Sequence, residues 1–79
     1  MNNLEKLNEI FVEIFSCNVL ELNAEFNKDT IDNWDSVRQL TLTSAIEETF
    51  DIFMDPEDII ACSSYNSAMD VLRKYGIKL

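Results

Sequence analysis

The chain has 79 residues, with 15 acidic and 6 basic side chains and no histidine. Its net charge of −9 argues against nucleic acid and anionic membranes as partners, because both attract clustered Lys and Arg; a basic protein surface is the natural complement. A single Gly and a single Pro argue against a turn-rich β fold, and an apolar fraction of 47% argues against disorder. We therefore expect one small domain spanning residues 1–79.

The sequence favours a cytoplasmic protein. Cys17 and Cys62 lie far apart, without the spacing of a metal or redox motif, so we interpret both as reduced thiols. The first residues lack a basic segment followed by an apolar one, so no signal peptide is expected. The longest apolar runs, such as residues 10–12, are far too short to span a bilayer, so no membrane span is expected.

An amphipathic helix is predicted over residues 3–17, because apolar residues recur there at spacings of three and four while charged residues fill the other face. Asn2 or Asn3 is expected to cap its start. The apolar stripe consists of Leu4, Leu7, Ile10, Phe11, Ile14 and Phe15.

Residues 18–33 lose this periodicity and predict a long loop, which is unusual in a compact domain and often functional. A short helical turn is predicted over residues 24–28, and Trp34 is expected to anchor the end of the loop by packing. Other apolar side chains are expected to pin the loop across the bundle, namely Val19, Leu20, Leu22, Phe26 and Ile31.

A second helix is predicted over residues 36–50. Its predicted buried stripe is Val37, Leu40, Ala45, Ile46 and Phe50, flanked by Leu42 and Thr43. The residues expected to face outward are Arg38, Gln39, Thr41, Ser44, Glu47 and Glu48. The two glutamates lie where the helix dipole disfavours acids, so they either serve a role outside the fold or are ordinary solvated charges.

Asp55 and Pro56 mark the start of a short third helix over residues 56–61, which is expected to bury Ile59 and Ile60.

A last helix follows, capped by Ser64 or Asn66 and stopped by Gly76. Its predicted buried stripe is Ala68, Met69, Val71, Leu72 and Tyr75. The fold class is therefore all-α: a small four-helix bundle of three main helices plus a short third helix, with a long loop between the first two.

The candidate functional residue is Ser36. Asp35 is expected to be the N-cap of the second helix, which places Ser36 near its first position. A side chain there tends to point outward, and the helix start favours an anion such as a phosphate. A phosphodiester on Ser36 would therefore be tolerated.

The segment Trp34-Asp35-Ser36-Val37, followed by Ile46-Glu47-Glu48-Thr49-Phe50-Asp51-Ile52, resembles the acyl carrier proteins over nearly the whole chain. The resemblance implies an acyl-carrier-like bundle. It also implies that a magnesium-dependent phosphopantetheinyl transferase attaches a 4'-phosphopantetheine arm to Ser36, with Asp35 orienting the site. The arm would carry an acyl or amino-acyl group as a thioester, and the interior could shelter an acyl chain. Acyl-loading and acyl-transfer enzymes would use their own basic patches to dock on the surface formed by Val37, Leu40, Glu47 and Glu48. The protein would act as a monomer.

Three departures from the family pattern favour a specialised bacterial carrier over one of general fatty acid synthesis. Trp34 stands where those carriers usually have Gly, and Arg38 and Thr41 stand where they often have acids. The Trp-Asp-Ser variant looks more like dedicated carriers for polyketides, amino-acyl groups or surface saccharides.

Other classes of function fit the residues less well. An unmodified acidic helical adaptor that binds a basic protein is the main alternative. The acids of residues 51–58 lack the Gly and ligand spacing of a calcium loop. No histidine or base–nucleophile pair supports an enzyme, and Ser36 has no His or Lys placed to activate it.

Overall fold

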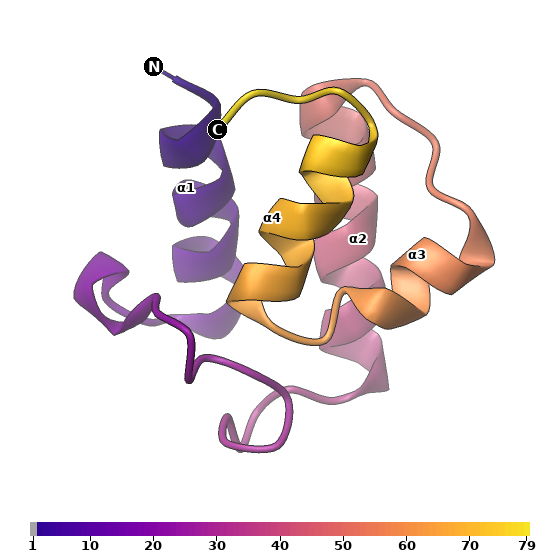
Figure 1. Ribbon diagram of the computed structural model, residues 1–79. Coiled ribbons are helices and arrows are strands. Elements are labelled where there is room, and N and C mark those ends of the chain that lie inside the picture. Colours follow the sequence, from indigo (N-terminus) through magenta and orange to yellow (C-terminus); the bar gives the residue numbers. More distant parts are fainter. Residues whose placement is uncertain (1) are drawn as a thin grey trace.

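Four α-helices and one short 3-10 helix form the regular structure of residues 2–79, the part of the chain described by the computed structural model (Figure 1). Helix α1 packs against α2, α2 against α3, and α3 against α4. The predicted all-α architecture is confirmed, including the short third helix and the long first loop. No helix of residues 2–79 is long and apolar enough to cross a membrane. The bounds are α1 Asn3–Phe15, η1 Val19–Glu21, α2 Ser36–Phe50, α3 Pro56–Ala61 and α4 Tyr65–Lys74.

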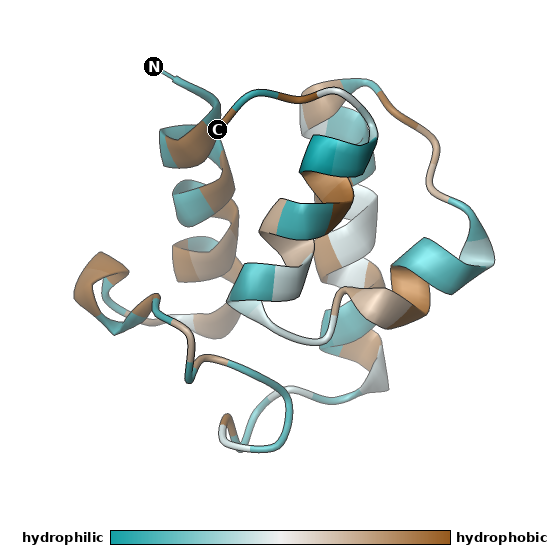
Figure 2. Ribbon diagram, viewed as in Figure 1, coloured by the Kyte–Doolittle hydropathy of each residue, from teal (hydrophilic) through white to brown (hydrophobic). Residues whose placement is uncertain are grey.

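Helix α1 is capped by Asn2, whose side-chain oxygen accepts a hydrogen bond from the Glu5 amide at 2.8 Å. The helix ends at Phe15, two residues before the predicted end. It stops there because Ser16 takes a left-handed backbone conformation, with φ of 52°. Brown and teal segments alternate along α1 in Figure 2, in agreement with its predicted amphipathic pattern.

Aromatic rings from α1, the long loop and α4 dominate the core. Phe11 is fully buried and its ring centroid lies between 5.4 and 6.0 Å from those of four other aromatic residues. These neighbours are Phe15, Phe26, Trp34 and Tyr65. The predicted role of Trp34 as a packing anchor is therefore confirmed. The fully buried aliphatic side chains beside the rings include Leu7, Leu42, Ile46 and Leu72.

The long loop is tied to the junction between α3 and α4. Phe26 is 3% exposed and pins the loop as predicted. The Tyr65 amide donates to the Phe26 carbonyl at 2.8 Å, and two residues later along the loop the Lys28 amide donates to the Ser63 carbonyl at 3.0 Å. These two backbone hydrogen bonds hold the segment that leads to Ser36 against the bundle.

Two expectations for the loop are wrong. The helical turn predicted over residues 24–28 does not form; the 3-10 helix η1 lies earlier, where Asn18 and Glu21 form a reciprocal capping box. Val19 and Leu20 are 49% and 86% exposed, so they do not pin the loop. The capping box satisfies the backbone of residues 18–21 locally and without burial. Residues 23–30 form turns instead of a helix, because the side chains of Asn23 and Asn27 accept from the Glu25 and Asp29 amides.

Helix α3 has its predicted bounds, but its apolar residues are less buried than predicted. Ile59 is half-buried, whereas Ile60 is 75% exposed, so the predicted burial of Ile60 is wrong. Adjacent residues of a helix point in different directions, so a helix this short turns only one of the two toward the core. Asp55 precedes the helix in extended conformation, but its side chain makes no capping hydrogen bond.

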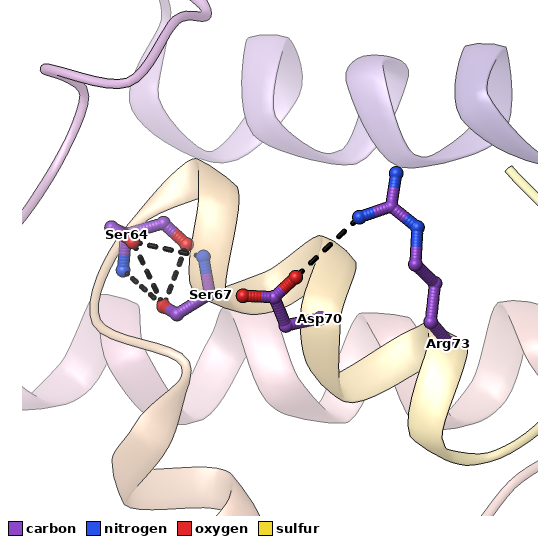
Figure 3. Close-up of polar contacts among 4 residues, drawn as sticks. All are labelled: Ser64, Ser67, Asp70 and Arg73. Carbon is purple, nitrogen blue, oxygen red and sulfur yellow. Dashed lines mark hydrogen bonds and ion pairs between the residues drawn. The ribbon is translucent and has the colours of Figure 1, made fainter.

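Helix α4 is capped by Ser64, one of the two predicted residues. Ser64 Oγ accepts from the Ser67 amide at 2.9 Å and Ser67 Oγ accepts from the Ser64 amide at 3.0 Å, which satisfies two amides at once (Figure 3). Gly76, with φ of +83°, follows the helix end as predicted.

Asp58 joins α3 to α4 through a polar cluster that the sequence did not predict. Its side chain is 8% exposed and accepts hydrogen bonds from Lys74 Nζ at 2.9 and 3.1 Å. The Tyr75 hydroxyl donates to Asp58 Oδ2 at 2.6 Å and accepts from the Asp55 amide at 3.1 Å. The Tyr75 and Lys74 hydrogen bonds lower the pKa of Asp58 below its ordinary 3.8.

Acid is expected to weaken this α3–α4 contact. Because the pKa of Asp58 is lowered in the folded state, its contribution to stability is present above the ordinary pKa of 3.8 and is lost as pH falls through the lower folded value. We expect Asp58→Asn to lower Tm at neutral pH, and the difference from wild type to shrink in acid below pH 3.8. Thermal melts followed by circular dichroism across this range measure it.

Asp70→Asn is the matched control for this experiment, because Asp70 makes only an exposed ion pair with Arg73 at 3.4 Å (Figure 3). Its Tm should track that of wild type. A Tm difference for Asp58→Asn that is the same at neutral and acidic pH would contradict the assignment.

Candidate functional site

The start of α2 places Ser36 on the surface. Asp35 has an extended backbone, and its Oδ1 accepts from the Arg38 amide at 2.8 Å, as the predicted N-cap should. Ser36 is then the first residue of α2 and is exposed. The prediction of a capped helix start with an accessible serine hydroxyl is confirmed.

Two basic side chains, Arg38 and Lys28, lie near Ser36. Arg38 Nη1 lies 3.6 Å from Asp35 Oδ2 and so partly offsets the charge of the capping carboxylate. Lys28, from the long loop, lines the same depression as Ser36. Two of the six basic residues of the chain thus lie close to Ser36. An anionic group on the Ser36 oxygen would meet positive as well as negative charge there.

Trp34, Gln39 and α3 are joined by hydrogen bonds directly beneath this site. Trp34 Nε1 donates to Gln39 Oε1 at 2.6 Å. Gln39 Nε2 in turn donates to the backbone carbonyls of Ile59 and Cys62, both at 2.7 Å. The prediction that Gln39 faces outward is therefore wrong: its side chain ties the segment before Ser36 to the end of α3.

An open depression of about 560 Å³ lies beside Ser36, between the long loop, the start of α2 and α3. Its half-buried and buried lining residues are Trp34, Gln39 and Ile59, and exposed residues surround them. It brings together three of the predicted site residues, Asp35, Ser36 and Leu40. The full lining is Lys28, Trp34, Asp35, Ser36, Gln39, Leu40, Ile59 and Ile60.

Val37 and Leu40 are exposed, at 70% and 60%, so their placement in the buried stripe of α2 is wrong. The side chains that α2 buries are Leu42, Thr43 and Ile46, two of which were predicted only to flank the stripe. Thr43 is accommodated because its hydroxyl lies within hydrogen-bonding distance of the Gln39 and Leu40 carbonyls of its own helix. Val37, Leu40 and Ile60 are exposed apolar side chains, and Leu40 and Ile60 line the depression beside Ser36.

Glu47 and Glu48 lie about three turns further along α2. Glu48 is exposed, whereas Glu47 is half-buried, and its Oε2 accepts from the Met54 amide at 2.9 Å. Glu47 thus fixes the connection between α2 and α3, a role within the fold that the sequence did not predict. Glu48 is the acid of this pair that remains free to meet a partner.

The thiols of the described residues are poor nucleophiles at neutral pH. Both cysteines are free; Cys62 is fully buried, and burial raises its pKa to about 11. Burial and the nearby Glu21 also raise the pKa of Cys17. The candidate site exposes the hydroxyl of Ser36 beside Lys28 and Asp35, and no hydrogen bond joins this hydroxyl to a base within the described residues.

The chain matches no known protein-family profile, and no curated protein is similar to it at a significant level.

Proposed function

We propose that this protein is an acyl carrier whose Ser36 bears a 4'-phosphopantetheine arm. The observation that carries the proposal is the position of Ser36: exposed, first in α2, directly after the capping Asp35 and at the edge of an open depression. Further support comes from the resemblance of residues 34–37 and 46–52 to the acyl carrier proteins, within an all-α bundle with a long first loop.

The attachment would be a transfer from coenzyme A catalysed by a magnesium-dependent phosphopantetheinyl transferase. Ser36 Oγ forms a bond to the phosphorus that carries pantetheine, the pyrophosphate P–O bond breaks, and adenosine 3',5'-bisphosphate leaves. The serine proton passes to a base of the transferase, which supplies what this chain lacks at Ser36. The attached arm then supplies a terminal thiol that holds an acyl or amino-acyl group as a thioester.

Asp35 and Arg38 have distinct parts in this proposal. Asp35 orients the site by fixing the start of α2 through its 2.8 Å hydrogen bond to the Arg38 amide. Arg38 and Lys28 offset the carboxylate of Asp35, so that a phosphodiester on Ser36 does not face an unbalanced acid. The start of α2 adds the partial positive charge of the helix dipole.

Partner enzymes would dock on the exposed side of α2. Val37 and Leu40 supply apolar contact, and Glu48 supplies charge for a basic patch; Glu47 contributes its charge while it holds the α2–α3 connection. The partners are the transferase and the enzymes that load and remove the acyl group. We further propose that the protein works as a monomer in the cytoplasm, where two free thiols persist.

Intact mass measurement tests the proposal. The protein is incubated with coenzyme A, magnesium and a promiscuous phosphopantetheinyl transferase, beside Ser36→Ala and Ser44→Ala. Both serines are exposed residues of α2, so each variant makes the same chemical change on the same helix. We expect wild type and Ser44→Ala to gain the mass of one phosphopantetheine, and Ser36→Ala to gain none.

The competing function is an unmodified adaptor that binds a basic protein through its acidic surface. It is favoured by the net charge of −9 and requires nothing of Ser36. If the folded wild type gains no mass while a known carrier is modified in parallel, the carrier proposal fails and the adaptor stands.

A further inference from the structure

The boundary between α2 and α3 is closed by the side chain of Gln39. Its two amide hydrogens are directed to the carbonyls of Ile59 and Cys62, at 2.7 Å each, and its oxygen accepts from Trp34 Nε1 at 2.6 Å. One side chain therefore joins the segment before Ser36, the first turn of α2 and the end of α3. Gln39 and Trp34 separate the depression beside Ser36 from the core.

The interior behind Gln39 is filled by protein side chains. Leu42 and Ile46 of α2 and Cys62 after α3 are fully buried. Trp34 packs on Phe15 with ring centroids 4.6 Å apart and closes the other side. A guest chain that enters here must displace these buried side chains.

We infer that the cargo stays outside the bundle, so that this chain does not enclose a long alkyl chain. The inference rests on the proposed function of Ser36. A chain entering from the arm would have to break three hydrogen bonds of Gln39. It would leave the Cys62 carbonyl and the Trp34 indole N–H without partners, and the Ile59 carbonyl with the Cys62 amide alone, which is costly even where apolar contact is gained.

The depression is suited to hold the arm and a short cargo at the surface. Leu40, Ile59 and Ile60 offer apolar contact on one side, and Lys28 and Asp35 offer polar groups on the other. This open lining does not enclose a longer acyl chain, so it gives such a chain no added contact over a short one. A bound group gains its contacts close to Ser36, and methylenes further out remain in water.

The experiment compares cargoes of increasing length on the same protein. The arm is transferred from acetyl-, glycyl-, octanoyl- and palmitoyl-coenzyme A, and intact mass establishes that each species is loaded. For each loaded species, Tm and the hydrogen exchange of the Leu42 and Ile46 amides are measured. For wild type we expect no rise in Tm and no added protection from acetyl to palmitoyl.

Gln39→Ala removes the hydrogen bonds that close the boundary between α2 and α3. For this variant we expect Tm and the protection of the two amides to increase with the length of the acyl group. Gln39→Leu, which keeps the volume but not the hydrogen bonds, serves if the alanine variant does not fold. Ser44→Ala, at an exposed position of the same helix, is the control and should behave as wild type.

The outcomes distinguish a failure of the proposed function from a failure of the inference about the cargo. Absence of any mass gain means that the proposed function has failed. If wild type loads normally and its Tm or core protection rises with octanoyl and palmitoyl groups, the inference about the cargo fails and the proposed function stands. Folded Gln39 variants that show no dependence on chain length likewise overturn the role of Gln39 as the closure.

Discussion

Phe11→Ala is expected to remove a large part of the stability of the fold. Phe11 is fully buried and contacts four aromatic rings. Truncating a buried Phe to Ala costs about 3–5 kcal/mol, because apolar area is lost and a cavity remains. A chain of 79 residues has a total stability of about 4–12 kcal/mol at the usual values per residue. We therefore expect Tm to fall by roughly 12–40 °C, measured by circular dichroism.

Phe53→Ala is the matched control, because it makes the same chemical change at a residue that is 90% exposed. Its free energy of unfolding should stay within about 0.5 kcal/mol of wild type in urea titrations. Equal losses for the two variants would contradict the view that the aromatic cluster around Phe11 holds the bundle together.

Trp34→Ala is expected to cost about as much, roughly 3–5 kcal/mol. Trp34 is 8% exposed, and its ring lies against Phe11, Phe15 and Phe26 at 4.6–6.0 Å. It is the last buried residue before Asp35 and Ser36, so the loss should loosen the start of α2 as well. Hydrogen exchange of the Arg38 amide, which Asp35 caps, should then be faster than in wild type.

Trp34→Phe separates the two contributions of this residue. The phenyl ring keeps most of the packing but leaves Gln39 Oε1 without its donor, at a cost of about 1–3 kcal/mol. Urea titrations followed by circular dichroism measure both variants, since Trp34 is the single tryptophan and its fluorescence is lost with it. If Trp34→Ala were no more destabilised than Trp34→Phe, the packing role would be refuted.

The helix boundaries were predictable because their signals are local. Asn2, Asp35, Pro56 and Gly76 each act on the backbone within a few residues, so the sequence alone indicates where helices start and stop. The exposure of Ser36 follows from the same kind of signal. This part of the candidate site is confirmed for the same physical reason as the fold.

The buried face of α2 was predicted incorrectly because its apolar residues do not mark one side. Val37 and Leu40 continue the spacing of a core stripe, yet they lie where no other element covers the helix. Which apolar residues are covered depends on where α3 and the loop lie, and the periodicity of α2 does not contain that information.

Gln39 and Asp58 could not be identified from sequence because their partners are distant. Gln39 donates to backbone carbonyls 20 and 23 residues away. Every residue has a backbone carbonyl, so the side chains at those positions do not reveal the partners of Gln39. Asp58 meets Lys74 and Tyr75 at separations of 16 and 17 residues. A buried acid is recognised only when the surrounding helices are in place.

The backbone bridge between the long loop and the junction before α4 also sets an order of events during synthesis. Phe26 and Lys28 form their hydrogen bonds with Tyr65 and Ser63, which leave the ribosome almost forty residues later. Helices α1 and α2 can form before then, with Trp34 packed on Phe15, but the part of the loop around Phe26 gains its backbone attachment only once that junction has emerged. A chain shortened before Ser63 would therefore keep Ser36 at the start of α2 but leave the middle of the long loop unattached.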